Sequence, residues 1–379
     1  MPNKVIISVF SLLLLTGCWD SKEIEDIGVI LAIGLDTGEK ENEVTMTNQY
    51  VDPGKIPSLQ GGEPGGKPFQ NLTVSGTTFL EIIRDNSFES NRPPNYTHLK
   101  SIVLSSSLLK RERADEVIDL FVRDHEFRRT TPVFITKERV RDVLDIEPTK
   151  ELFPAIQIKD LNENSFKNLY IPEQLQIGDM SKYISQEQSF LIPGMKIEEY
   201  LIKSDGAGII SKENFQFVGW LEKEDIAGVR FILNDLDGGY INLTKKEISD
   251  GPVSLEVKGG STTYNPTITG ESIMMEFNVR VNVSLAEDWG NKRDHFKKGW
   301  KKEVEKASND QIEQAVQTVL TKAQQEYKTD FLNLSNWVRI HQPDYWKKNE
   351  KRWDNIFPEM QTKINVKTKI TDFGTQNLK

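Results

Sequence analysis

Cysteine is almost absent from this sequence, and histidine is scarce. Cys18 is the single cysteine among 379 residues, so an internal disulfide is impossible and packing must stabilise the fold. The four histidines are dispersed along the chain and none has a second ligand at helical spacing: they are His98, His125, His295 and His341. Without a cluster of thiols and imidazoles we expect no metal site, and no pattern indicates a cofactor.

An excess of positive charge is also missing. The chain has 48 Lys and Arg against 57 Asp and Glu, which gives a formal net charge of −9 at pH 7. Phosphate backbones and anionic headgroups repel a surface of that sign, so we expect no nucleic acid as a ligand. Attachment to a membrane would therefore need something other than surface charge.

No apolar run in the chain reaches the length of a membrane-spanning helix. The run Val5–Leu15 is too short to cross a hydrocarbon core, which takes about 20 residues. It ends at Leu15-Thr16-Gly17-Cys18, which has the order of a bacterial lipobox. We therefore expect residues 1–17 to be a removed signal peptide, Cys18 to carry diacylglycerol, and residues 18–28 to form a lipidated tether. The alternative is an ordinary secretory signal with an incidental cysteine.

Strands and helices alternate in the first half of the chain after the tether. Apolar residues at 29–33, turn residues at 36–38 and alternation at 44–50 predict a β-hairpin. Further patterns predict helices over 77–88 and 114–127, and strands over 101–105 and 132–136. This order favours a sheet covered by helices. Residues 29–195 are therefore expected to form an N-terminal α/β region, in which the irregular stretch from about 147 is a candidate second subdomain.

Residues 196–379 are expected to form a C-terminal α+β domain, in which long helices pack on an antiparallel sheet. Short strands are predicted at 208–210, 215–221 and 229–233, and the alternation over 273–285 predicts a long half-buried strand. A helix with Ile312 to Tyr327 on its apolar face follows, and Ser308 with Gln311 predicts a capping box at its start. A last helix near Pro343 and a closing strand at 364–370 complete the chain.

Two short motifs resemble catalytic signatures but are incomplete. Gly61–Lys67 spells the G-x-x-x-x-G-K phosphate-binding pattern, yet Pro68 stands where Ser or Thr is needed, and the flanks are a Gly- and Pro-rich loop over 52–68. Ser107 and Lys110 fit S-x-x-K without the companion motifs of serine acyl enzymes. We therefore predict no catalytic residues and no enzyme activity.

Acidic and aromatic residues give two further patterns. Asp235 and Asp237 precede Gly238-Gly239, which indicates a hairpin turn because the acidic order of a calcium loop is absent. Near the C-terminus, Trp346 and Trp353 lie seven residues apart, with Phe357 one turn later and Trp337 nearby. This spacing favours core residues of a helix, and a docking surface for another protein is the alternative.

Four blocks of the chain carry a recognisable pattern in order. The first is Cys18-Trp19-Asp20 with Glu23 and Ile24, followed by Gly34-Leu35-Asp36; the second is Phe127–Pro132; the third is Gly206–Leu221. The last holds Gln325–Phe331, Pro343–Trp346, Trp353, Ile356–Pro358 and residues 366–374. Together they resemble the Ger(x)C spore germination lipoproteins, the C subunits of nutrient germinant receptors. Leu332-Asn333-Leu334-Ser335 departs from the Gly-Phe-Gly-like stretch frequent in that family.

This resemblance implies a noncatalytic subunit of three compact domains, anchored through Cys18 on the outer face of the inner spore membrane beside integral-membrane receptor subunits. Trp19 and Asp20, next to the anchor, are candidate partner-interface residues. The resemblance does not identify the nutrient ligand. A solute-binding lipoprotein of a transporter and a cell-wall-acting enzyme are the alternatives: the first needs two similar α/β lobes, and the second needs a polar catalytic cluster.

Overall fold

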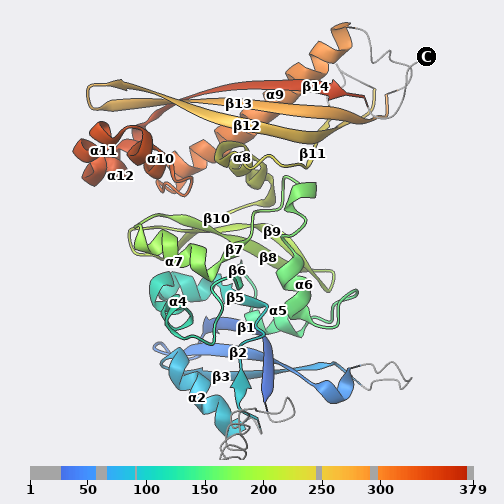
Figure 1. Ribbon diagram of the computed structural model, residues 1–379, viewed down its shortest axis with the longest axis vertical. Coiled ribbons are helices and arrows are strands. Elements are labelled where there is room, and N and C mark those ends of the chain that lie inside the picture. Colours follow the sequence, from blue (N-terminus) through green and yellow to red (C-terminus); the bar gives the residue numbers. More distant parts are fainter. Residues whose placement is uncertain (1–26, 57–65, 90–91, 245–249, 291–297, 374–379) are drawn as a thin grey trace, which may run out of the picture.

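The computed structural model describes residues 27–56, 66–89, 92–244, 250–290 and 298–373. Cys18, Trp19 and Asp20 therefore lie outside the described residues, as does most of the Gly- and Pro-rich loop. The described chain is stacked along one long axis, with β1 to β3 at one end and the C-terminal sheet at the other (Figure 1). Within the described ranges, no helix is long and apolar enough to cross a membrane.

The first sheet begins with an antiparallel meander. β1 (Gly28–Thr37), β2 (Val44–Val51) and β3 (Phe69–Gly76) pair in sequence order, which confirms the predicted hairpin. The apolar side chains of β1 enter two cores, one on each face of the sheet, because Ile30 and Leu31 point in opposite directions. A short 3-10 helix, η2 (Pro53–Lys55), follows β2.

Parallel strands extend this sheet from β1. β5 (Ser101–Ser105) pairs with β1, β6 (Pro132–Thr136) with β5, and β8 (Phe190–Glu198) with β6, all in parallel. β5 and β6 are buried along their whole length, as continuous apolar strands of a covered parallel sheet are. Their bounds coincide with the predicted ones.

Two short strands and two antiparallel strands complete the ten-stranded sheet, whose main order is β10-β9-β8-β6-β5-β1-β2-β3. β4 (Pro94–Asn95) pairs with β1, and β7 (Leu175–Gln176) pairs with β6. β9 (Leu201–Ile210) and β10 (Phe217–Leu221) continue the sheet beyond β8 in antiparallel order.

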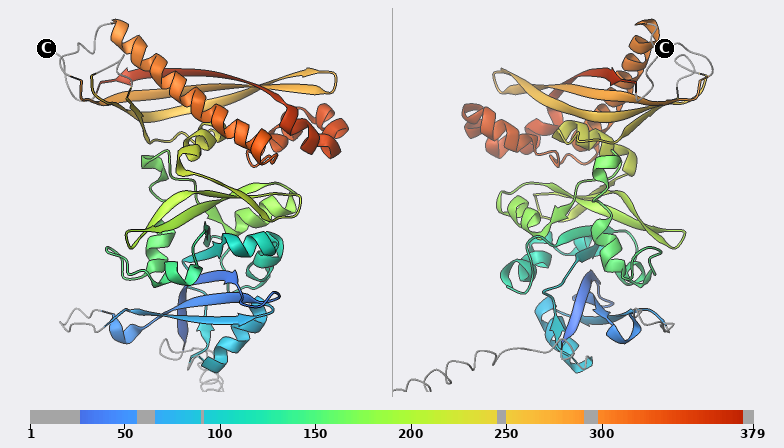
Figure 2. Two further views of the ribbon diagram at one scale, coloured as in Figure 1. Left: turned by 180° about the vertical axis from the view of Figure 1, so that it is seen from behind. Right: turned by 45° about the vertical axis from the view of Figure 1, so that its right-hand side comes forward.

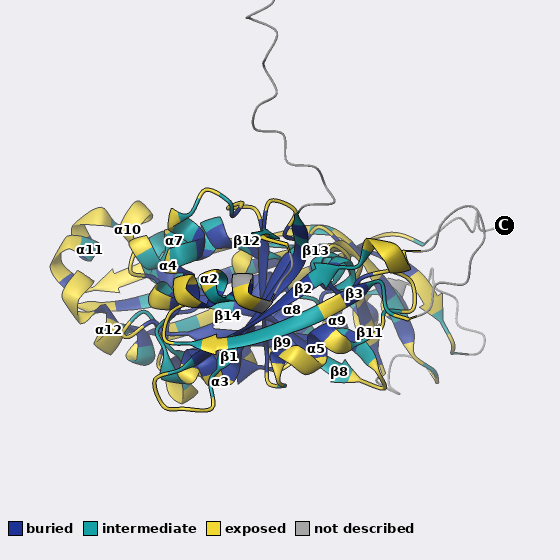
Figure 3. Cartoon of the chain, turned by 90° about the horizontal axis from the view of Figure 1, so that it is seen from below, coloured by how far each residue is buried: buried dark blue, intermediate teal, exposed yellow. Residues whose placement is uncertain are grey.

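Helices cover both faces of the sheet, which confirms the predicted α/β arrangement. One apolar core is enclosed by α2 (Phe79–Glu89), α3 (Ser106–Arg111), α4 (Ala114–Arg123) and α7 (Ile177–Ser185). The other is enclosed by α5 (Val140–Asp145) and α6 (Pro154–Asp160), and the 3-10 helix η3 (Ser165–Lys167) follows α6. Viewed from below, buried residues concentrate along the strands and exposed residues along the helices at the rim (Figure 3).

The domain boundary that the sequence predicts between residues 195 and 196 falls within a strand of the first sheet. Both residues lie inside β8, and β8 forms an antiparallel pair with β9 across this point. β9 and β10 therefore belong to the first sheet, although the sequence pattern grouped them with the C-terminal domain. Local alternation cannot reveal this, because strand pairing is set by distant parts of the chain. The change from one sheet to the other occurs between β10 and β11.

The second sheet has the order β11-β12-β13-β14. Its strands are β11 (Tyr240–Leu243), β12 (Val253–Thr269), β13 (Ser272–Asp288) and β14 (Gln361–Asp372). The long half-buried strand and the closing strand are confirmed. β14 runs parallel to β13, however, so the sheet is mixed and not wholly antiparallel.

The long helix α9 (Lys298–Thr321) lies along one face of this sheet and continues into a π-helical turn, η4 (Lys322–Glu326) (Figure 2). The predicted capping box at Ser308 is wrong, because Ser308 lies within α9. Its buried hydroxyl is 3.1 Å from the Thr368 hydroxyl of β14. The polar residue therefore joins helix and sheet and does not begin the helix.

The strand predicted at 229–233 is wrong, because these residues belong to the helix α8 (Lys223–Leu233). Asp225 forms a capping box with Glu222, whose backbone N–H donates to the Asp225 carboxylate at 2.9 Å. All residues from Asp225 to Ile232 are buried, so the helix shows no amphipathic period, and a short buried helix cannot be distinguished from a strand by pattern alone. Asp235 to Gly239 consequently join a helix to β11 and do not form a hairpin turn between strands.

The sequence predicts one helix near Pro343, but the structure has three short helical segments there. They are α11 (Pro343–Asn349), the 3-10 helix η5 (Glu350–Arg352) and α12 (Trp353–Glu359), preceded by α10 (Leu334–His341). The ring centroids of Trp346 and Trp353 are 5.5 Å apart, and those of Trp353 and Phe357 are 6.3 Å apart. Trp353 and Phe357 are fully buried, which confirms that they are core residues.

Candidate functional site at the junction of the two sheets

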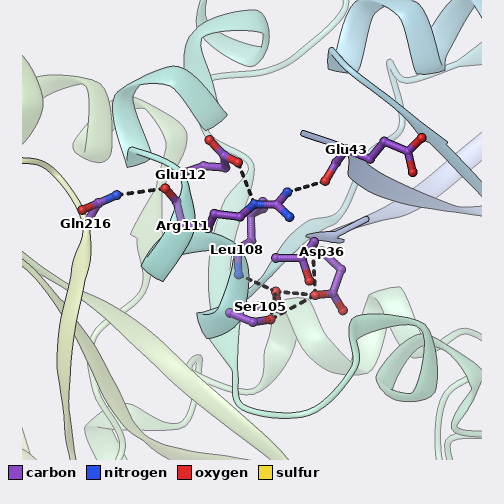
Figure 4. A network of polar contacts seen from close by, with 9 residues as sticks. Asp36, Glu43, Ser105, Leu108, Arg111, Glu112 and Gln216 are labelled. Atoms are coloured by element: carbon purple, nitrogen blue, oxygen red, sulfur yellow. Dashed lines mark hydrogen bonds and ion pairs between the residues drawn. The ribbon is translucent and has the colours of Figure 1, made fainter. Parts of the chain in front are cut away.

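Asp36, from the first family-like block, organises the carboxyl ends of β1 and β5 (Figure 4). Its Oδ1 accepts hydrogen bonds from the Ser105 hydroxyl at 2.6 Å and the Ser107 hydroxyl at 3.2 Å. Its Oδ2 accepts from the backbone N–H of Val140 at 3.2 Å, at the first turn of α5. Ser105 in turn accepts from Leu108 N–H at 3.0 Å and caps α3. The carboxylate thus fixes the starts of two helices.

The S-x-x-K residues of α3 do not form a catalytic pair. Ser107 donates to Asp36, whereas the Lys110 ammonium lies over the Phe217 ring, 5.3 Å from its centroid. On the same helix, Arg111 donates to the Glu43 carbonyl and pairs with Glu112 at 2.8 Å, while Gln216 donates to the Arg111 carbonyl at 2.9 Å (Figure 4). These bonds join the turn before β2, helix α3 and the turn before β10, so this network is structural.

Lys67 of the incomplete phosphate pattern is also engaged within the fold. Its ammonium donates to the Asp145 carbonyl at 2.8 Å and lies 3.6 Å from the Glu147 carboxylate. Residues 61–65 of the pattern lie outside the described ranges. In the described part of the motif, Lys67 therefore connects the segment before β3 to the end of α5.

The third and fourth family-like blocks meet where β10 contacts the end of α9. The Tyr327 hydroxyl donates to the Trp220 carbonyl at 3.1 Å, and burial raises the pKa of Tyr327 to about 12. A Cβ at Gly219 would lie 2.1 Å from the Tyr327 ring, so the ring requires glycine there. Lys322 adds a 2.6 Å ion pair to Asp225 of α8. These contacts fasten the second sheet to the first.

Asp330 fixes the loop that departs from the family pattern. Its carboxylate is buried and accepts hydrogen bonds from Leu334 N–H at 3.0 Å, Ser335 N–H at 2.7 Å and the Trp353 indole at 3.1 Å. Burial raises the pKa of Asp330, and these donors act in the opposite direction. The block that resembles the family therefore keeps the start of α10 and the tryptophan core together.

A cavity of about 110 Å³ lies beside this junction. One wall comes from residues 172–175, α7 and β8, and the other from α8 and the loop at 331–333. Aromatic and aliphatic side chains dominate its surface, including Tyr183, Phe190, Ile226 and Phe331. Small-molecule sites are often apolar cavities at such junctions, with a few polar groups that orient the ligand.

The polar groups of the cavity centre on Arg230, which is 3% exposed. Its guanidinium donates to both carboxylate oxygens of Asp235, at 2.5 and 3.2 Å, and to the carbonyls of Ser165 and Asn168, at 2.6 and 3.0 Å. Glu173 lines the same cavity, and partial burial together with the Asp235 charge raises the pKa of Glu173.

Sequence reasoning missed this site except for Asp235, which it assigned to a turn. The lining residues come from segments about 160 positions apart along the chain, between Pro172 and Asn333. The signal available was weak: a cluster of charged residues around an apolar run at 229–233. In the described ranges, no group of three or more His, Cys, Asp or Glu is placed to hold a metal ion.

Comparison with known proteins extends over the whole fold. Residues 20–197 match the family described as "Spore germination protein N-terminal domain", and residues 205–374 match "Spore germination B3/GerAC like, C-terminal". The chain is 32% identical to "Spore germination protein B3" of Bacillus subtilis (strain 168), with 98% of each chain covered. It is 30% identical to "Spore germination protein A3" of the same strain, with 99% of each covered.

A solved structure supports the same relationship. The chain resembles the crystal structure of the GerBC protein with a TM-score of 0.62 and 27% sequence identity, over 93% of this chain and 100% of that one. The similarity therefore includes both sheets and the junction between them.

Proposed function

Because the chain belongs to the Ger(x)C family of spore germination proteins, we propose that it is a noncatalytic, lipid-anchored subunit of a nutrient germinant receptor. The observation that carries this proposal is the match to germination proteins along nearly the whole chain, through both sheets. A receptor subunit of this kind would act by binding integral-membrane partner subunits on the outer face of the inner spore membrane.

The lipobox supports the proposed anchor. Cys18 precedes the first residue of β1 by ten positions, which span at most about 35 Å when extended. Diacylglycerol on Cys18 would therefore keep the folded body close to the bilayer and raise its effective concentration near membrane partners. Trp19 and Asp20 lie next to this anchor in the sequence, and so we propose them as contacts to those partners.

The two sheets favour this role over that of a solute-binding lipoprotein. Such a protein needs two similar lobes with a ligand cleft between them. Here the first sheet has ten strands with helices on both faces, whereas the second has four strands, one of which is parallel to its neighbour. A cell-wall-acting enzyme would need a catalytic cluster, and the two incomplete catalytic motifs are engaged in structural contacts.

Deletion and complementation test the proposed function. A strain without the gene should lose the germination response to particular nutrients while other nutrients still act. The wild-type gene should restore the response, and Trp19→Ala with Asp20→Ala should restore it only weakly. An Asp354→Ala variant, altered at an exposed position far along the chain, is the matched control and should complement fully. Normal germination of the deletion strain with every nutrient, in a background without redundant receptors, would contradict the role.

A further inference from the structure

The cavity beside α8 presents hydrogen-bond acceptors to its interior. The carboxylates of Glu173 and Asp235 and the amide group of Asn333 line it. The Oδ1 atom of Asn333 is buried and makes no hydrogen bond within the described part of the chain. A buried acceptor without a donor is unfavourable, so the binding of a ligand that supplies an N–H group to this acceptor is favoured.

The main hydrogen-bond donor of the cavity lining, the Arg230 guanidinium, is already bonded within the protein. Arg230 is the one cation that lines the cavity among the described residues, and its guanidinium already makes bonds to Asp235, to Ser165 and to Asn168. When Glu173 is ionised, the charges of Glu173, Asp235 and Arg230 sum to one negative charge. In that state the cavity favours a cationic donor over an anion.

The apolar wall sets the size and shape of the remaining part of a ligand. Tyr183 and Phe190 are stacked at an interplanar angle of 10° with ring centroids 5.6 Å apart, and Phe331 lines the cavity with them. Aromatic faces attract cations as well as aliphatic groups. A volume of about 110 Å³ is smaller than that of a cavity which holds benzene, about 150 Å³, so only a few non-hydrogen atoms fit.

We propose that this cavity binds a small primary ammonium ion with a short aliphatic tail. Its N–H groups would donate to Glu173, Asp235 and the Asn333 Oδ1, and its tail would lie against Phe190 and Phe331. This inference does not depend on the receptor role, because it follows from the geometry of the junction alone.

Protonation of the titratable groups around the cavity should compete with binding of the ammonium ion. They are Glu173, Tyr183, Arg230 and Asp235 on the lining, with Asp237 acting on Glu173 and Asp179 acting on Tyr183. Since partial burial and Asp235 raise the pKa of Glu173, this carboxyl keeps its proton to higher pH than an ordinary glutamate does, and an ammonium ion must displace that proton. The apparent affinity should therefore increase as pH rises through the pKa of Glu173.

Binding of three molecules of similar size to the full-length chain in detergent tests the proposal. The probes are n-butylammonium, n-butanol and butyrate, and the readout is ligand-observed NMR titration. n-Butylammonium should bind saturably, while the alcohol and the anion should bind at least about tenfold more weakly because they lack charge-assisted donors. Saturable binding of butyrate or butanol as tight as that of the amine would overturn the proposal, and so would the absence of saturable amine binding.

Two variants locate the binding in the cavity. Glu173→Gln should weaken n-butylammonium binding about tenfold and remove its pH dependence, whereas Glu213→Gln, at an exposed position in the turn before β10, should bind like the wild type. Asn333→Gly keeps the left-handed backbone, φ 55°, that this position requires, while it removes the acceptor, and it should also weaken binding. Wild-type affinity in a folded Glu173→Gln protein would refute the site.

Discussion

Asp330, which is buried, and Tyr264, which is half-buried, connect elements of the C-terminal half through polar contacts. Asp330 joins α10 to the indole of Trp353. Tyr264 of β12 donates its hydroxyl to the Ile232 carbonyl at the end of α8, and its ring packs on Phe277 and Trp337. In both cases a polar atom beside apolar side chains has a specific partner, so its removal leaves that partner without this hydrogen bond.

Asp330→Ala should lower the free energy of unfolding by about 3 kcal/mol, because two backbone N–H groups and an indole N–H lose a buried acceptor together. Urea unfolding followed by tryptophan fluorescence measures the change. Asp354→Ala is the matched control: this carboxylate is exposed, pairs with Lys212 at 2.9 Å, and should change stability by less than about 1 kcal/mol. Equal effects of the two substitutions would contradict the structural role of Asp330.

Tyr264 should make stability depend on pH in the alkaline range. Burial raises the pKa of Tyr264 to about 12, whereas an unfolded tyrosine has a pKa of about 10. The unfolded state therefore loses this proton first, and the contribution of Tyr264 to stability is complete below about pH 10 and decreases as pH rises toward about 12. Urea unfolding at several pH values should show that the stability difference between the wild type and Tyr264→Phe shrinks across this window. A constant difference would contradict a buried phenol.

At the scale of elements, the sequence predicted the strands whose burial shows in their own run of residues. The alternation of β13 and the apolar runs of β5 and β6 identify strands because each reflects burial on one face or on both. α8 was mistaken for a strand because it is buried on all sides. The parallel pairing of β14 and the attachment of β9 to the first sheet could not be predicted, since both depend on contacts between distant segments. The cavity was missed for the same reason.

α8 and α9 approach each other so closely that a glycine is required at the contact. A Cβ at Gly228 would lie 2.4 Å from the Ala315 carbonyl oxygen. Gly228→Ala should therefore destabilise the protein by about 2 kcal/mol, because the clash exceeds the roughly 1 kcal/mol that alanine gains in helix propensity. Gly299→Ala, in the first turn of α9 where a Cβ meets no atom within 4 Å, should be neutral or slightly stabilising in thermal unfolding. A stable Gly228→Ala protein would show that the two helices separate easily.

At the scale of the whole molecule, one end carries the start of β1 and the other carries the C-terminal sheet (Figures 1 and 2). The two sheets share an apolar core: Ala207, Ile209 and Leu221 of the first sheet pack in the same cluster as α8, α9 and the second sheet. Together with the Tyr327 and Lys322 contacts, this core makes the junction a continuous connection. A tether at Cys18 would place the β1 end nearer the membrane, and a rigid junction would allow contacts at that end to be transmitted along the stack.

Crosslinking in intact spore membranes, followed by gentle detergent extraction and mass spectrometry, tests the proposed receptor role most directly. The wild-type chain should fractionate with the membrane and recover integral-membrane receptor subunits, with crosslinks near Trp19 and Asp20. Cys18→Ala should incorporate no fatty acid and should leave the membrane fraction unless its partners retain it. Recovery of the wild-type chain from the membrane without any integral-membrane partner, or fatty-acid labelling that persists in Cys18→Ala, would contradict the account.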